Sequence, residues 1–169
     1  MTKRIFISVL SLAVVAALAG CGITTPQNND NAGIDESGSY KSVKGTQIRM
    51  STENTEVIIT LNDSRAASDL VAMLPLELTL IERNSFAKGM TLPEQLSSKE
   101  ATTREYKIGD FGYWNAGPDL AIFYDDIYEQ TIVEVIPLGH AESGAEAMAS
   151  EIGTVKLELL TEESKENRK

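Results

Sequence analysis

The chain has 169 residues, of which 42% are hydrophobic and 24% are charged, and this is the composition of a globular protein with one proper core. The formal net charge of −10 argues against non-specific nucleic-acid binding, because such binding needs Lys and Arg to neutralise phosphates. The same charge argues against electrostatic docking on anionic lipid. The single cysteine excludes an internal disulfide framework and a thiolate zinc cluster.

The N-terminal end has the pattern of an export signal. Lys3 and Arg4 precede an uncharged apolar run over residues 5–19, which is shorter than the roughly 20 residues that span a bilayer. The run leads into Leu-Ala-Gly and Cys21, a tetrapeptide that resembles a bacterial lipobox, in which the cysteine receives a lipid and becomes the new N-terminus. The alternatives are an ordinary signal peptide with a chance cysteine and a short membrane anchor.

We therefore predict four segments. Residues 1–20 are a lipoprotein signal peptide, and residues 21–46, which are rich in Asn, Gly, Ser, Thr and Asp, are a lipidated flexible tether. Residues 47–162 form the globular domain, and residues 163–169 are a charged tail. The mature protein is expected to be exported and anchored to the bacterial cell envelope through a lipid on Cys21, at the outer membrane if the host is Gram-negative.

The first half of the domain predicts three strands and a helix. Residues 47–51 and 57–61 alternate apolar and polar side chains around a polar turn, which favours a two-stranded hairpin. A helical face follows before Pro75, with apolar residues spaced at i, i+3, i+4 and i+7: Ala67, Leu70, Val71 and Leu74. Residues 76–80 alternate again and are expected to form a third strand.

The second half is richer in strands. Residues 82–107 show no clean period and are expected to contain short strands or turns. Residues 108–126 read as a central aromatic hairpin, and residues 131–138 as a buried β-branched strand. A second helix over 145–152 and a last strand over 155–159 follow. Strands that are not separated by helices in βαβ fashion indicate a mostly antiparallel sheet, closed or nearly closed into a barrel with helices over its ends.

Short motifs in this half resemble cyclophilins. The Asn-Ala-Gly-Pro sequence at 115–118 precedes Ile-Phe at 122–123, and Pro-Leu-Gly at 137–139 precedes Gly-Ala-Glu-Ala-Met at 144–148. The pattern is closer still to the small bacterial cyclophilin-like domains, a group without an assigned activity. The resemblance covers about residues 47–160. It implies a mainly β fold, namely a closed cyclophilin-like eight-stranded antiparallel barrel with two capping helices.

The resemblance also implies a candidate ligand groove that includes Arg83, Asn115 and Phe123. Trp114 is added because aromatic rings give large contact area, but strand alternation is equally consistent with a place in the core for Trp114 or Phe123. Cyclophilins are peptidyl-prolyl isomerases, but here Ala121 stands where that family has a glutamine. The region 131–135 also lacks the family's pocket histidine. An isomerase must stabilise the twisted amide better than the planar one, so the loss of polar partners argues against efficient catalysis.

We therefore expect a module that binds a peptide or a small molecule without efficient catalysis. The alternatives are an envelope peptidyl-prolyl cis-trans isomerase with a degenerate groove and an accessory lipoprotein without a small-ligand site.

No other catalytic or metal-binding pattern is apparent. His140 is the only histidine, and no G-x-S-x-G elbow accompanies it. Asp125, Asp126 and Glu129 lack the ligand spacing and glycine of a calcium loop, so we interpret them as a solvated acidic loop. Neither Gly-rich phosphate motif is present. The sequence therefore predicts no catalytic residue, no metal and no cofactor, and its expected partners are the membrane, through the lipid, and a peptide or small-molecule ligand.

Overall fold

The structure is a computed structural model that describes residues 40–114 and 116–161, all of which belong to one compact unit. The predicted signal peptide, Cys21, most of the predicted tether, Asn115 and the charged tail lie outside the described residues.

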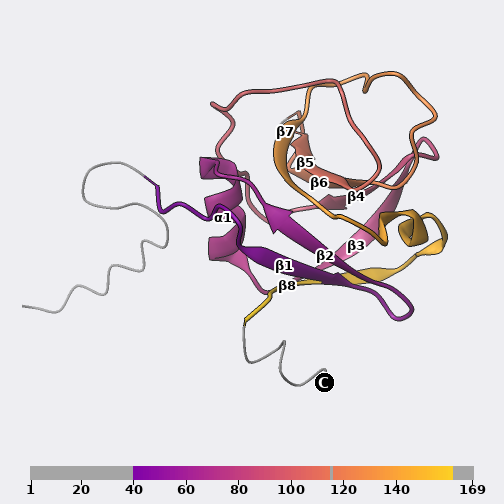
Figure 1. Cartoon of the computed structure of the whole chain (residues 1–169), viewed down its shortest axis with the longest axis horizontal. Helices are drawn as coiled ribbons and strands as arrows, with labels where there is room; N and C mark the ends of the chain where they lie inside the picture. Colours follow the sequence, from indigo (N-terminus) through magenta and orange to yellow (C-terminus); the bar gives the residue numbers. More distant parts are fainter. Residues whose placement is uncertain (1–39, 115, 162–169) are drawn as a thin grey trace, which may run out of the picture. The chain divides into compact units, whose positions relative to one another are not determined.

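The described residues form a closed antiparallel barrel of eight strands in the order β1-β2-β7-β5-β6-β4-β3-β8 (Figure 1). The strands are β1 (Gln47–Ser51), β2 (Glu56–Leu61), β3 (Leu76–Arg83), β4 (Ala87–Thr91), β5 (Asp110–Trp114), β6 (Asp119–Phe123), β7 (Ile136–His140) and β8 (Thr154–Leu159). Pairing of β1 with β8 closes the barrel. An α-helix, α1 (Arg65–Met73), and a 3-10 helix, η1 (Ala145–Ser150), lie on opposite sides of it in Figure 1. The predicted fold class is confirmed.

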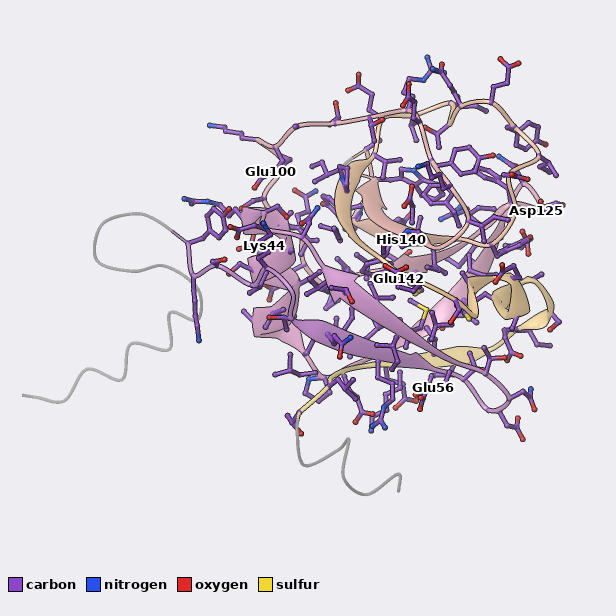
Figure 2. The ribbon with its side chains drawn as sticks, viewed as in Figure 1. Lys44, Glu56, Glu100, Asp125, His140 and Glu142 are labelled. Carbon is purple, nitrogen blue, oxygen red and sulfur yellow. The ribbon has the colours of Figure 1, made fainter. Side chains whose placement is uncertain are left out.

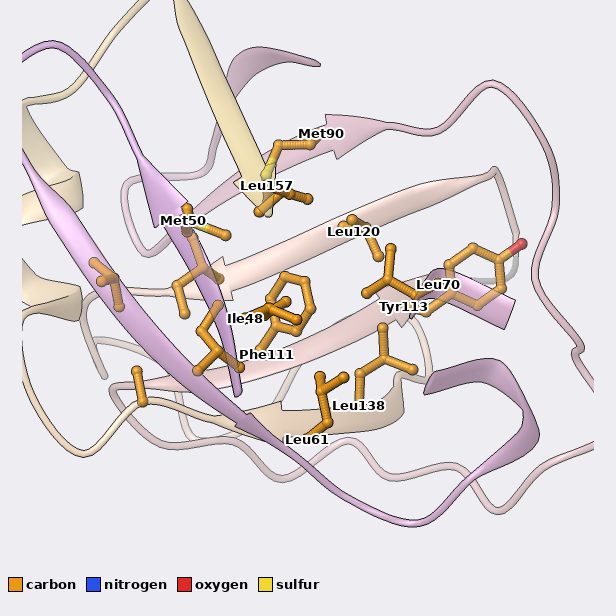
Figure 3. Close-up of a cluster of buried hydrophobic side chains, with 14 of the residues drawn as sticks. Ile48, Met50, Leu61, Leu70, Met90, Phe111, Tyr113, Leu120, Leu138 and Leu157 are labelled. Atoms are coloured by element: carbon orange, nitrogen blue, oxygen red, sulfur yellow. The ribbon is translucent and has the colours of Figure 1, made fainter. Parts of the chain in front are cut away.

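The barrel interior is filled by the inward-facing half of each alternating strand, as Figure 3 shows. The largest fully buried members include Ile48, Met50, Leu61, Met90, Phe111, Tyr113 and Leu120. Helix α1 adds Leu70 to this core, and the Ser64 side chain caps the helix by accepting a hydrogen bond of 3.1 Å from the backbone N–H of Ala67. Because one face of each strand is packed inward, the register of the whole sheet is strongly specified.

Two predicted elements differ from the observed ones. The strand expected over 131–138 begins only at Ile136, and Ile132 and Val133 are exposed. The second helix is a 3-10 helix whose buried residues, Ala145 and Met148, are three apart, as a three-residue turn requires. Ile152, which the α-helical period would bury, lies beyond it and is 83% exposed. The unplaced region 82–107 contains β4.

Candidate ligand-binding site

Strands β5 and β6 carry aromatic side chains on both faces. Phe111 and Tyr113 point into the barrel, whereas Trp114 and Phe123 point outward into a second hydrophobic cluster. This outer cluster consists of six buried residues and the half-buried Tyr106 packed against them: Phe86, Ala87, Trp114, Ala121, Phe123, Val135 and Tyr106. Phe123 lies at its centre and is only 1% exposed, with ring centroids 4.7 Å from Tyr106 and 5.6 Å from Phe86.

Three small residues lie side by side on neighbouring strands, beneath the larger side chains of this cluster. Ala121 is in register with Gly89 on β4 and with Gly112 on β5. A Cβ atom on Gly112 would lie 2.2 Å from Cγ1 of Val135, and one on Gly89 would lie 2.6 Å from Nε of Arg83. The two glycines therefore leave the space in which Val135 and Arg83 lie against the sheet.

An outer cavity of about 680 Å³ opens beside the outer cluster. Its volume is within the range of small-molecule sites. Apolar side chains form much of its wall: Phe86, Trp114, Tyr128, Ile132 and Val133. Polar groups come from Arg83, Asp119, Gln130 and Thr131.

The structure brings together only part of the candidate groove. Arg83 and Trp114 line the outer cavity. Phe123 does not line it and lies instead within the outer cluster, edge-on to Trp114 at 6.2 Å between ring centroids. Asn115 lies outside the described residues. Phe123 therefore acts as a support for the cavity wall.

Arg83 is held in place by an acidic and an aromatic neighbour. Its Nη2 donates a hydrogen bond of 2.8 Å to Oδ2 of Asp119, and Thr91 donates its hydroxyl to the other Asp119 oxygen. The Arg83 guanidinium lies 5.9 Å from the centre of the Trp114 ring, within cation–π range. Asp119 thus compensates the charge of Arg83 at the cavity wall.

Two buried N–H groups at this wall have no hydrogen-bond partner among the described residues. They are Nε of Arg83 and Nε1 of Trp114. A buried donor without an acceptor costs about 1–3 kcal/mol, so such groups need an explanation. Nε of Arg83 lies against Gly89 of β4, and Arg83 and Trp114 both line the outer cavity.

The acidic loop, residues 125–134, forms the far wall of the cavity and exposes large apolar side chains. Ile132 is 83% exposed, Ile127 is 52% exposed and Tyr128 is 50% exposed. The loop is nevertheless fastened to the segment before β5. The Tyr128 backbone N–H donates to the Tyr106 hydroxyl at 3.0 Å, and Arg104 donates from Nε to the Thr131 carbonyl at 2.7 Å. The apolar side chains are therefore presented by an anchored backbone.

A charged cluster lies on β3 and β4, and the sequence did not reveal it. Its lysine is buried, whereas its carboxylate, Glu82, is exposed. Lys88 is 3% exposed, and its Nζ lies 2.7 Å from Oε2 of Glu82. The Tyr124 hydroxyl donates to the other Glu82 oxygen at 2.7 Å. Burial acts to raise the pKa of Glu82, but the hydrogen bonds from Lys88 and Tyr124 outweigh it, so the pKa is lowered. Burial and the bond to Glu82 raise the pKa of Tyr124.

The other candidate catalytic and metal-binding groups do not contribute to the outer cavity. His140 ends β7 and places Nδ1 2.8 Å from Oδ1 of Asp110, and neither residue lines the outer cavity. Among residues 40–114 and 116–161, no three His, Cys, Asp or Glu side chains are grouped so that they could hold a metal ion. None of the helices in that part of the chain has the length and apolarity needed to cross a bilayer.

The closed eight-stranded antiparallel barrel with two helices is the architecture that the cyclophilin resemblance implied. The chain matches the Cyclophilin-like family over residues 50–159 and belongs to that family. No curated protein gives a significant match.

Two solved structures share the fold. The hypothetical protein AF2241 from Archaeoglobus fulgidus has a TM-score of 0.59 at 17% identity, with 71% of this chain and 98% of that chain covered. McbB, solved in complex with tryptophan, has a TM-score of 0.55 at 12% identity, with 69% of this chain and 45% of that chain covered. At these identities the similarity extends to the fold alone.

Proposed function

We propose that this protein is an exported, lipid-anchored binding module that holds a peptide or a small molecule in the outer cavity. The observation that carries the proposal is the cavity itself: an apolar, aromatic wall that includes two buried N–H donors without partners among the described residues. Sites of this kind bind ligands through apolar contact and fix their orientation through a few polar groups. Export and anchoring rest on the segment before Cys21, which lies outside the described residues.

Binding without efficient catalysis suits the polar groups at the cavity. Arg83 already donates to Asp119, which reduces its ability to stabilise a twisted amide. Ala121 is fully buried and has no amide to offer, and His140 does not line the cavity. The alternative, a prolyl isomerase, is favoured by one observation, namely that Arg83 lines the cavity. An assay of proline-containing peptides with wild type and Arg83→Ala distinguishes the two, because only an isomerase exceeds the uncatalysed rate.

The binding proposal can be tested with N-phenylnaphthylamine, a neutral apolar fluorophore. The dye should bind the wild type at one saturable site and quench Trp114, the only tryptophan, which lies in the cavity wall. Ile132→Ser should weaken dye binding about threefold or more, because it removes an apolar wall. Ile152→Ser is the matched control, because Ile152 is equally exposed, at 83%, and does not line the cavity. Equal dye affinity in the two variants would contradict the proposed site.

A further inference from the structure

We propose that the natural occupant of the outer cavity is a polypeptide segment in which a large apolar side chain is flanked by Lys or Arg. This inference rests on the proposed binding function and names the class of partner. It follows from the charge of the acidic loop, from the extent of its exposed apolar surface and from the closure of the barrel.

The charge of the loop is one-sided. Residues 125–134 contain four carboxylates and no basic residue. Asp125 accepts a hydrogen bond from the backbone of Asp126, and Glu134 accepts one from the Thr102 hydroxyl, so both acids bond to neutral donors. Asp126 and Glu129 are exposed and form no ion pair within the described part of the chain.

The nearby basic residues do not cancel this charge. Arg83 is paired with Asp119, and Lys88 is paired with Glu82. Arg104 donates to the Thr131 carbonyl. Lys107 lies with Glu129 at the edge of a separate polar hollow and offsets one charge at most. A cationic partner is therefore favoured over a neutral or anionic one.

The exposed apolar surface of the acidic loop extends beyond the outer cavity. Ile132, Val133 and Tyr128 line the cavity, but Ile127 is 52% exposed and does not. Such a patch beside a cavity is typical of a protein interaction site. A small molecule in the cavity would leave Ile127 in water, whereas a peptide that continues past the cavity would cover it. This extent favours a polypeptide over a small cationic amphiphile.

The closed barrel also restricts how a peptide binds. Each of the eight strands has a paired neighbour on both sides, although β2 meets β7 only through Thr60 and Leu61, so the described barrel offers no whole edge strand for strand addition. Recognition must therefore come from side chains, with an apolar anchor in the cavity and basic groups facing Asp126 and Glu129. This arrangement is an apolar anchor with a charged rim, as in other protein interfaces.

The test uses three blocked peptides that differ only in charge: acetyl-Ala-Lys-Phe-Lys-Ala-amide and its analogues with Glu or Gln in place of both Lys. Binding is followed by the fluorescence of Trp114, since the peptides contain no tryptophan. The Lys peptide should bind about threefold or more tightly than the Gln peptide, and the Glu peptide most weakly. Raising the NaCl concentration from 0.05 to 0.5 M should remove most of the difference.

Two charge-matched double variants locate the effect. Asp126→Asn with Glu129→Gln should reduce the preference for Lys over Gln to less than about twofold. Glu142→Gln with Glu146→Gln removes the same charge elsewhere, on exposed residues that do not line the cavity, and should leave the preference intact. Figure 2 shows Glu142 well separated from Asp125 of the acidic loop.

Three results would overturn the inference. Equal affinity for the three peptides would remove the charge preference, even if N-phenylnaphthylamine still bound and the binding function stood. Binding of none of the peptides while the dye bound would also contradict it. If Trp114 fluorescence instead changed with protein concentration alone, and Ile132→Ser abolished that change, the occupant would be a second copy of the chain.

Discussion

At the scale of single residues, the outer face of the barrel depends on glycines that leave space for larger neighbours. Gly89 and Gly112 flank Ala121, and each lies under the side chain of a residue from another segment. Arg83 can therefore lie at the cavity because Gly89 has no side chain to displace it. Glycine has a low strand propensity, so local sequence preference does not explain Gly89 and Gly112. The close approach of the Arg83 and Val135 side chains to the strands does explain them.

Gly89→Ala should displace Arg83 from Asp119 and Trp114, because the new methyl group would lie 2.6 Å from the Arg83 Nε. The side chain is flexible, so we expect a loss of stability of about 1 kcal/mol or less but a severalfold loss of affinity for N-phenylnaphthylamine. Fluorescence titration measures the affinity and urea unfolding measures the stability. In an Arg83→Ala background, Gly89→Ala should have no further effect on affinity; a full additional loss would show that Gly89 acts by another route.

Tyr124→Phe should raise the pKa of Glu82, because the Tyr124 hydroxyl is one of the two side-chain donors that hold this carboxylate in its ionised form. We expect a loss of stability of about 1 kcal/mol at neutral pH, as for other single hydrogen bonds. The carboxyl carbon of Glu82, followed by NMR through an acid titration, measures the pKa. Tyr128→Phe removes a hydroxyl from an exposed ring and is the control; an equal shift of the Glu82 pKa there would contradict the assignment.

At the scale of elements, the site depends on two segments that cover the outer face of β4, β5 and β6. Val135 and Thr103 form an isolated antiparallel bridge, with N–H to O=C distances of 2.8 and 2.9 Å in the two directions. The bridge joins the segment before β5 to the end of the acidic loop. The outer cluster is thus a second, smaller core, and it holds the cavity wall.

Gly112→Ala should loosen this cover, because its Cβ would lie 2.2 Å from Cγ1 of Val135. We expect a destabilisation of about 1–3 kcal/mol, the usual cost of overpacking, and faster amide exchange at Thr103 and Val135 than in the barrel strands. Hydrogen exchange by NMR measures the local effect. Adding Val135→Ala should recover part of the loss; no recovery would place the strain elsewhere.

At the scale of the whole molecule, carboxylates with lowered pKa values tie separate parts of the fold together. Hydrogen bonds from Thr52 and Thr55 lower the pKa of Glu151, which joins the end of η1 to the β1–β2 turn. Hydrogen bonds from Lys156 and Arg49 lower the pKa of Glu158, and the bond from Arg49 links β8 to β1 across the seam of the barrel. Glu82 on β3, whose pKa is also lowered, pairs with the buried Lys88 on β4.

The stability of the protein should therefore fall under acid conditions. A carboxylate whose folded pKa is lowered stabilises the fold above its ordinary value, here 4.5, and this stability is lost as the pH falls through the folded pKa. The pH dependence from Tyr124 runs the other way, because its folded pKa is raised. Its contribution to stability is present below its ordinary pKa of 10.0 and is lost as the pH rises above that value. Melting temperatures measured from pH 7 to pH 3 test the acid limb, and Glu151→Gln should flatten it; an unchanged melting temperature at pH 3 would contradict this account.

Cys21→Ser should release the protein from the membrane fraction and abolish labelling with a radioactive fatty acid, because the proposed anchor is a thiol-linked lipid. Fractionation of cells that express the full chain provides the measurement, and substitution of a polar tether residue, Ser37→Ala, is the control. Retention of unprocessed Cys21→Ser protein in the membrane would show that residues 5–19 act as an anchor by themselves.

The sequence by itself determined the period-2 strands, the α1 helix and the central hairpin, because local alternation, helical spacing and turn residues carry these signals. It therefore also determined the fold class and the family. The tertiary structure decided which face of β5 and β6 meets which core, so Trp114 lines the cavity while Phe123 is buried in the outer cluster. It also decided where Ile132 and Val133 lie. Their β-branched side chains predicted a strand, but in the structure they form part of the cavity wall. Burial, charge pairing and contact between distant segments depend on closure of the barrel, and no local pattern records them.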